Sequence, residues 1–144
     1  MPSRREEPLL RTNCFEVSIG DRELGFAQVG RLSSETDVLD ASPARAEHRW
    51  ATVILRRALT SSTELYDWRR NIVLGKDDRR DVTIRQLSAP GGKVVHAWRL
   101  VRSWPRRWSG PAFDAMSNDI ACEELEVTFD DLVWLDHDPT TPGG

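Results

Sequence analysis

The chain has 144 residues, of which 30% are charged and 39% belong to the hydrophobic set, and its formal net charge is −3. This length fits one domain that buries about two thirds of its unfolded surface, and so small a net charge gives no reason to expect a polyanionic partner. No apolar run approaches the ~20 residues of a membrane span, and residues 1–8 lack the apolar stretch of a signal peptide. We therefore expect a protein made and kept in the cytoplasm unless it leaves by another route.

The ends of the chain differ in composition from its middle. Residues 1–12 are polar and contain proline, which predicts a flexible arm, and residues 136–144 predict a flexible tail in the same way. Between them, residues 13–135 are expected to form a single domain. Cys14 and Cys122 lie far apart and follow no metal-ligand spacing, so two reduced thiols are favoured over a disulfide.

The first half of this domain reads mainly as strands. Apolar and polar residues alternate from Cys14 to Ile19, which is typical of a half-buried strand, and Gly20-Asp21 indicates a turn. Phe26–Gly30 and Ser33–Asp40 can pair as extended segments. A second strong strand, rich in valine and isoleucine, is predicted over Trp50–Leu59.

One helix is predicted over residues 62–74. Ser61 precedes Glu64 by three positions, the spacing of a capping box. Leu65, Trp68 and Ile72 then recur on one helical face and are expected in the core. Gly75 is the natural end of this helix.

The remainder returns to strand. Val82–Leu87 and Lys93–Trp104 flank a turn at residues 89–92. Pro105 is expected to end the second strand, since it cannot donate to a ladder, with an irregular loop over 105–118. A last strand carries Leu125, Val127 and Phe129. The fold class is therefore mainly β, a barrel or sandwich with one flanking helix at about 62–74. The expected core comprises Leu65, Trp68, Ile72, Trp98, Val127 and Phe129.

The sequence offers little for catalysis, and we expect no enzyme, no metal and no cofactor. No nucleophile elbow, metal-ligand motif or glycine-rich phosphate loop is present. Asp136-His137-Asp138 lies in the predicted tail, where solvation is favoured over metal binding. Glu123-Glu124 and Asp130-Asp131 look like carboxylate pairs. Glu124, Glu126 and Asp130 fall on the polar face of an alternating strand, so a solvated face is favoured over an acid–base pair.

Charge is distributed unevenly. Lys76–Arg107 contains nine basic and three acidic residues, whereas Asp114–Asp138 contains nine acidic residues and no Lys or Arg. The two segments can pair within the fold or between identical copies, and the sequence leaves both open. Trp104 and Trp108, near the predicted loop, fit a buried anchor and a subunit contact equally well.

An ordered series of phrases resembles one family, the tail-tube proteins of contractile bacteriophages and extracellular contractile injection systems. The resemblance runs from about Phe15 to Leu135. Its phrases stand at residues 25–32, 54–60, 65–68 and 75–84, and most specifically at 98–126, where Trp104-Pro105, Gly110-Pro111 and Ser117-Asn118 recur in order. Residues 41–49 depart from the family pattern.

The resemblance implies a structural subunit that forms six-fold rings, which stack into a hollow tube for puncture and cargo delivery. Implied partners are other copies, sheath, baseplate and other tube subunits, and lumen cargo, with assembly in the cytoplasm into a phage tail or a released particle. Interface candidates are Pro43, Arg45, His48, Arg49, Trp104, Arg106, Arg107 and Trp108. Glu124 and Glu126 are candidates for the lumen.

Three alternatives remain beside the tube subunit. The departure at residues 41–49 favours a specialised ring that initiates the tube at the baseplate. A monomeric ligand-binding barrel fits the size and strand content. The tryptophan- and arginine-containing stretch fits a single-strand nucleic-acid binder, which salt-dependent binding of oligonucleotides would reveal. For a hydrolase, the sequence offers no convincing set of catalytic residues.

Overall fold

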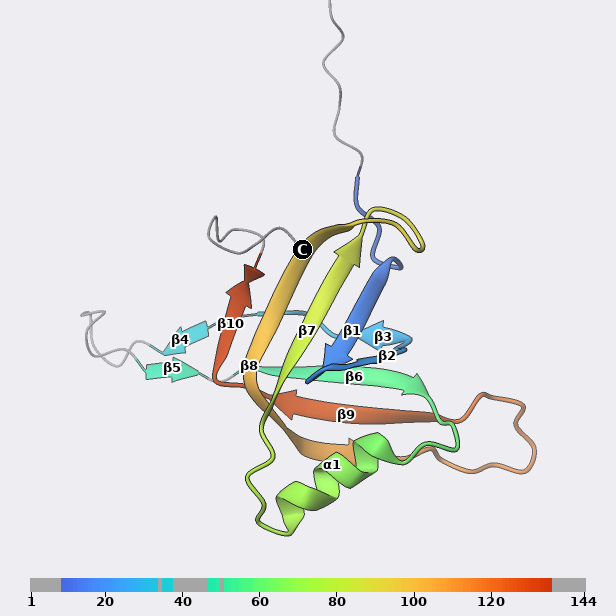
Figure 1. Ribbon diagram of the computed structural model, residues 1–144. Coiled ribbons are helices and arrows are strands. Elements are labelled where there is room, and N and C mark those ends of the chain that lie inside the picture. The colour runs from blue at the N-terminus through green and yellow to red at the C-terminus, as the bar shows by residue number, and fades with distance from the viewer. Residues whose placement is uncertain (1–8, 34, 38–46, 50, 136–144) are drawn as a thin grey trace, which may run out of the picture.

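The computed structural model describes residues 9–33, 35–37, 47–49 and 51–135, and these form mostly antiparallel β structure with one helix (Figure 1). The strands are β1 (Phe15–Ile19), β2 (Arg22–Leu24), β3 (Gln28–Val29), β4 (Glu35–Asp37), β5 (Glu47–Arg49), β6 (Thr52–Ala58), β7 (Arg80–Leu87), β8 (Val94–Ser109), β9 (Cys122–Thr128) and β10 (Asp131–Trp134). The helix α1 spans Glu64–Val73. The predicted fold class, mainly β with one flanking helix, is confirmed.

One long strand joins two layers of sheet. The strand order is β2-β1-β7-β8-β9-β6-β3, with β10 added alongside β8. The first part of β8 pairs with β7 and β10, and its last part, Trp104–Ser109, pairs with β9. In Figure 1, β1, β7 and the first part of β8 run steeply across β6 and β9, so the sheet folds over on itself. The extended segments around β3 and β4 pair with β6 and β5 respectively, not with each other.

The core lies between the two layers and the helix α1. Leu65, Trp68, Val127 and Phe129, which the sequence places in the core, are all buried. Trp98 is half-buried and packs against them, and Ile72 is half-buried outside this cluster. The other buried members are Val17, Ile19, Leu24, Val53, Leu55, Val82, Ile84, Leu100 and Leu125.

The expected end of the strand at Pro105 is wrong, because β8 continues to Ser109. Pro105 is buried and lies at a register shift before Arg107, where a missing N–H interrupts the ladder least. Its carbonyl accepts a hydrogen bond from Arg69 Nη1 at 3.1 Å. Just before it, Arg102 adopts φ 52°, and the strand changes partners there. The irregular loop therefore covers residues 110–121.

The helix ends as predicted but begins differently. Gly75, with φ +79°, donates to the Ile72 carbonyl and Lys76 donates to the Asn71 carbonyl, the hydrogen bonds of a Schellman motif. The predicted capping box is wrong: Thr63 is the N-cap residue and its side chain makes no cap hydrogen bond, while the Glu64 N–H donates to Ser62 Oγ at 3.4 Å. The reason is that the Glu64 carboxylate pairs instead with Arg22 and Arg57.

Candidate assembly surfaces

In the described part of the chain, one layer of the sheet has two open edges. It consists of β3, β6, β9 and the last part of β8, in that spatial order. Among the described residues β3 pairs only with β6, and Trp104–Ser109 pairs only with β9. On either side of β3, Ala27 and Gly30 donate to carbonyls of β6, and Val29 on β3 lies directly opposite Leu55. In an antiparallel ladder this pattern turns the N–H of Val29 away from β6, toward the open edge.

The face of this layer that lies away from α1 is polar. Arg56 lies opposite Glu124, and Ile54 and Arg107 lie on either side of Glu126. The Arg56 and Glu124 side chains are about half exposed, with Nε and Oε1 3.9 Å apart. Glu124 and Glu126 alternate with the buried Glu123, Leu125 and Val127, so neither is buried against the helix. We call this surface the open face.

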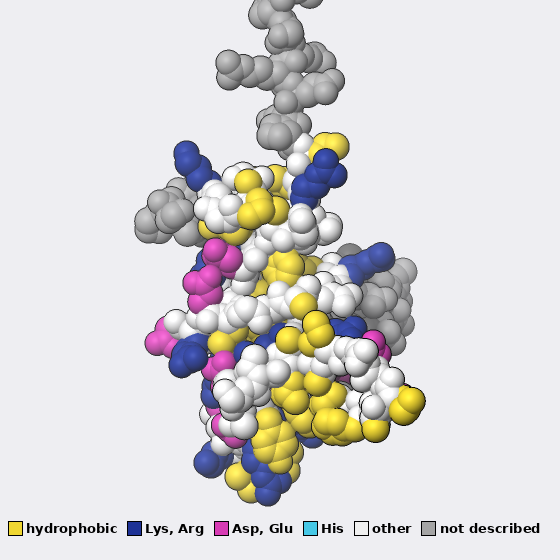
Figure 2. Space-filling model, turned by 90° about the vertical axis from the view of Figure 1, so that its right-hand side faces the viewer, with side chains coloured by type: hydrophobic (Ala, Val, Ile, Leu, Met, Phe, Trp, Pro, Cys, Tyr) yellow, Lys and Arg dark blue, Asp and Glu magenta, His cyan; other side chains and the backbone are white. Residues whose placement is uncertain are grey.

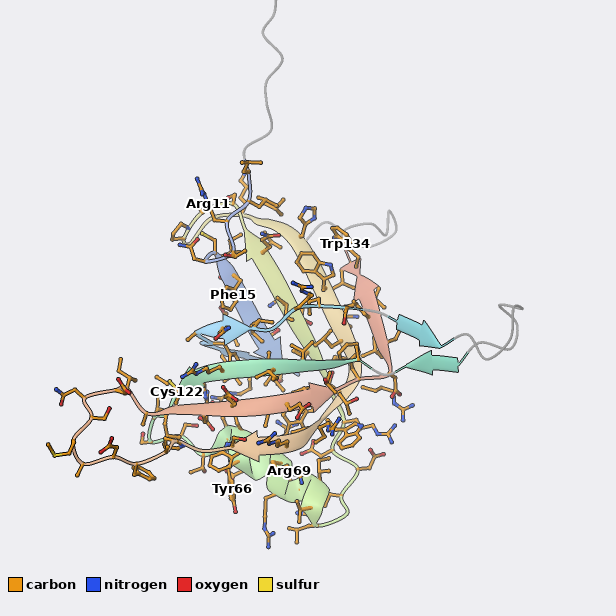
Figure 3. All side chains as sticks on the ribbon, turned by 180° about the vertical axis from the view of Figure 1, so that it is seen from behind. Arg11, Phe15, Tyr66, Arg69, Cys122 and Trp134 are labelled. Carbon is orange, nitrogen blue, oxygen red and sulfur yellow. The ribbon has the colours of Figure 1, made fainter. Side chains whose placement is uncertain are left out.

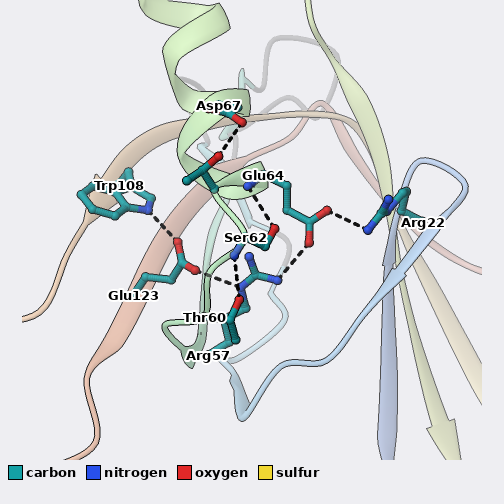
Figure 4. A network of polar contacts seen from close by, with 9 residues as sticks. Arg22, Arg57, Thr60, Ser62, Glu64, Asp67, Trp108 and Glu123 are labelled. Carbon is teal, nitrogen blue, oxygen red and sulfur yellow. Dashed lines mark hydrogen bonds and ion pairs between the residues drawn. The ribbon is translucent and has the colours of Figure 1, made fainter.

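A buried network of polar side chains holds the helix to the opposite face of the layer (Figure 4). Arg57 Nε donates to Glu123 Oε2 at 3.0 Å, and Arg57 Nη1 lies 3.3 Å from Glu64 Oε1 on α1. Trp108 Nε1 donates to the other Glu123 oxygen at 2.9 Å, and its ring contacts Tyr66 edge-to-face. Only 1% of Glu123 is exposed, so this member of the paired acids does not share the solvated face of Glu124 and Glu126.

This network was not predicted from the sequence, because its residues lie far apart along the chain. Arg57 and Glu123 lie 66 positions apart and meet only because β6 and β9 pair with Arg57 opposite Glu123. The alternation along β6 contained a weak signal, because Arg57 occupies the phase of the buried Val53 and Leu55. A charge in an apolar phase requires a buried partner.

A second polar cluster fixes the end of the helix to β7. Asp78 receives hydrogen bonds from Arg80, at 2.9 and 2.8 Å, and from Asn71 at 2.9 Å. The hydrogen bond from Arg80 lowers the pKa of Asp78 below its usual 3.8. Burial acts in the opposite direction, and the hydrogen bond from Asn71 adds to the lowering. Trp68 Nε1 donates to the Asp78 carbonyl, and the Arg80 guanidinium lies over the Trp68 ring.

The basic and acidic segments meet in part within the chain. Asp130 pairs with Arg102 at 3.3 Å and lies 3.9 Å from Arg79. Arg106 and Arg107 are exposed, and no ion pair to either is present among the described residues. These two arginines therefore remain available to a second molecule.

The other predicted interface residues are placed unequally. Trp104 is half-buried and lines a cleft of about 300 Å³ with Ile72 and Gly75. Trp108 belongs to the buried network, so its indole acts as an anchor within the subunit. His48 and Arg49 lie on β5, where only the backbone is described, and Pro43 and Arg45 lie outside the described residues.

Other classes of site find no support in the described part of the chain. There, no group of three or more His, Cys, Asp and Glu side chains is arranged to hold a metal ion. The helix described is too short and polar to cross a membrane. Cys14 and Cys122 are both free thiols, as predicted.

A family model and several solved structures are similar to this chain. Residues 11–133 match the family described as T4-like virus tail tube protein gp19. A chain from the sheath–tube complex of an extracellular contractile injection system, PVC, in its extended state shows 26% identity and a TM-score of 0.75, covering 89% of this chain and 92% of that one. A chain from the PVC sheath/tube terminator shows 27% identity and a TM-score of 0.78, covering 90% and 98%.

A more distant structure shares the fold alone. Hcp1 from Flavobacterium johnsoniae is 14% identical, with a TM-score of 0.60 over 91% of this chain and 96% of that one. No curated protein sequence matches the chain. Since the family match covers most of the sequence and the sheet architecture agrees with it, the chain belongs to the T4-like virus tail tube protein gp19 family and is a structural subunit of a tube, not an enzyme.

Proposed function

We propose that six copies of this chain join edge to edge into a closed ring, and that such rings stack into the hollow inner tube of a contractile injection particle. The assembling unit spans residues 13–135, with residues 1–12 and 136–144 as arm and tail. The observation that supports the ring is the four-stranded layer with one open edge at β3 and another at the last part of β8.

Open edges with free backbone groups favour pairing with another chain, and closure of the ring removes them. Because a head-to-tail contact repeats around a rotation axis, one kind of interface is enough to close the assembly. Arg106 and Arg107 lie on the β8 edge of that interface. Their free charges suit a contact with acidic groups of the next copy.

The open face then faces the channel. Its polar character suits a water-filled lumen, and both signs of charge are present on it: Glu124 and Glu126 are interleaved with Arg56 and Arg107. The helix and its network lie on the outer side of this layer. The lumen is thus expected to be nearly balanced in charge at this level of the tube, without a single dominant sign.

The partners follow from the same assembly. The PVC chains similar to this one come from a sheath–tube complex and a sheath/tube terminator, so sheath and tube-end proteins of the same particle are the expected partners, with baseplate proteins and lumen cargo. The particle is assembled in the cytoplasm and released. Divergence at residues 41–49 supports one variant of this role, a specialised ring that starts the tube on the baseplate.

The edge contact can be tested by removing one backbone donor. Val29→Pro deletes the N–H that points away from β6 and leaves the hydrogen bonds donated by Ala27 and Gly30 in place. Val29→Ala is the matched control, since it also truncates the side chain but keeps the N–H. We expect Val29→Pro to remain folded and monomeric by circular dichroism and mass measurement, while Val29→Ala forms rings visible by electron microscopy.

Normal rings from the proline variant would refute the assignment of β3 as an interface strand. If the wild-type chain never forms a ring or filament at any concentration, the tube proposal itself fails. In that case a monomeric ligand-binding barrel becomes the better description.

A further inference from the structure

The loop at residues 110–121 carries apolar side chains into solvent. Phe113, Met116 and Ile120 are 88%, 92% and 78% exposed, and they are among the most exposed large apolar residues described. A cavity of about 690 Å³ separates the loop from Arg56 and Glu124 on its own open face. Figure 1 shows the loop standing out from the body, and Figure 2 shows hydrophobic side chains gathered on the side toward which it projects. Such a cluster indicates a surface that is covered by a partner.

A groove of complementary character lies elsewhere on the molecule. It measures about 660 Å³ and runs between the segment before β1, the β3 segment and the ends of β7 and β8. Phe15, Phe26, Val29 and Trp98 line it and pack against the core beneath. In Figure 3, Arg11 and Phe15 mark this region, and Cys122 marks the base of the loop. The groove is large enough for several side chains.

The charges of the two surfaces are opposite. Among the described residues that line the groove, Arg11 alone is charged. The loop contains Asp114 and Asp119 and no basic residue. A loop with two carboxylates and an apolar cluster therefore matches a groove with an apolar floor and a basic rim.

Strand directions bring the two surfaces together between copies. Along the layer, β3, β6, β9 and the last part of β8 are successively antiparallel, so β8 runs opposite to β3. Rotation about a ring axis preserves these directions, so the β8 edge of one copy meets the β3 edge of the next in antiparallel orientation. Ser109 then lies toward the Phe26 end of the neighbour's β3, and the loop that follows Ser109 emerges beside the groove.

We infer that the loop at residues 110–121 of each copy seats its Phe113, Met116 and Ile120 side chains in the groove of the neighbouring copy in the ring. The inference rests on the proposed edge-to-edge ring and assigns a second, side-chain component to the same interface. The groove supplies the contact that the loop does not make with its own body. Backbone pairing at the edges sets the register of the two strands, and the loop contact favours another copy of this chain as the neighbour.

Cross-linking tests the contact in the full-length chain. In a Cys14→Ser/Cys122→Ser background, Phe113→Cys on the loop is combined with Ala27→Cys, an exposed residue lining the groove. A short bis-maleimide linker should produce a ladder of covalent oligomers ending at the closed ring. The control pair, Phe113→Cys with the exposed Val73→Cys on α1, should remain uncross-linked. Mixing chains that each carry one of the two test cysteines should yield covalent dimers only.

A second arm measures the strength of the contact. Replacing Phe113, Met116 and Ile120 together by serine removes only exposed side chains, so the fold is retained. The protein concentration at which rings appear should rise about tenfold or more, because central apolar anchors dominate interface energies. An unchanged ring-forming concentration would contradict the inference.

The outcomes separate this contact from the ring itself. Rings visible by electron microscopy without cross-linking of the test pair would overturn the loop–groove contact and leave the edge-to-edge ring standing. Preferential linkage of Ala27→Cys to a cysteine at Glu7 would assign the groove to the N-terminal arm and also overturn it. Absence of any assembled species would overturn the ring, and the loop contact with it.

Discussion

Replacement of Glu123 by glutamine tests the buried network that joins β9 to the helix. Glu123 is 1% exposed, and the Arg57 side chain with which it pairs is 8% exposed. Glutamine keeps the shape of the side chain and an acceptor for Trp108, but it removes the charge that balances Arg57. One Arg57 nitrogen, Nη2, is already buried without a partner, so the remaining contact with Glu64 compensates the guanidinium incompletely.

Removing one partner of a buried ion pair costs about 3–5 kcal/mol, and we expect about 3 kcal/mol here because Glu64 retains part of the pairing. For a chain of this size that corresponds to a fall of roughly 9 °C in Tm. The assay is urea unfolding of the monomer, below the concentration at which rings form, since assembly would add to the apparent stability. The neighbouring Glu124→Gln, at a half-exposed ion pair, should change the unfolding free energy by less than about 0.5 kcal/mol.

A loss below about 1 kcal/mol in Glu123→Gln would refute the reasoning that Arg57 depends on this carboxylate. The double variant Arg57→Met/Glu123→Leu offers a further check. Replacing both charges with apolar side chains of similar volume leaves no buried cation, so the double variant should be more stable than Glu123→Gln alone. If the double variant is destabilised as much as Glu123→Gln or more, the reasoning about the unbalanced Arg57 charge is contradicted.

Three further predictions concern separate parts of the fold. The lowered pKa of Asp78 gives stability that is present above pH 3.8 and is lost as the pH falls through the lower pKa of the folded state. Asp78→Asn should therefore lose less unfolding free energy than the wild type as the pH falls through that range. Urea titration at each pH measures this difference. Gly75→Ala should cost about 1 kcal/mol in thermal unfolding because of its φ of +79°, whereas Gly25→Ala, where an added Cβ meets open space, should cost less. Charge reversal of Arg106 and Arg107 together should impair ring formation, scored by electron microscopy, far more than it changes the monomer Tm; normal rings would remove both from the interface.

Elements with a strong local pattern were predictable from sequence. The helix followed from the spacing of Leu65 and Trp68 and from Gly75 after its last turn, and the strand before Gly20 followed from alternation. These signals are local because backbone geometry sets the side-chain period. The start of the helix was predicted less accurately. Glu64, the residue expected to cap the helix, forms ion pairs with Arg22 and Arg57 instead.

Features that depend on contacts between distant strands were not predictable. A proline normally argues against a central strand, but Pro105 lies at a bulge where the ladder shifts register. The burial of Glu123 depends on the pairing of β6 with β9, and its local sign is weak: Glu123 shares the strand phase of the apolar Leu125 and Val127. The groove beside β3 is formed by segments from four parts of the chain, so no single stretch of sequence indicates it.

The length of β8 has a mechanical consequence. Its sixteen residues belong to both layers, so the covalent backbone itself connects the strands proposed to line the channel with those outside them. An axial load applied to one layer is therefore passed to the other through peptide bonds as well as through hydrogen bonds and side-chain contacts.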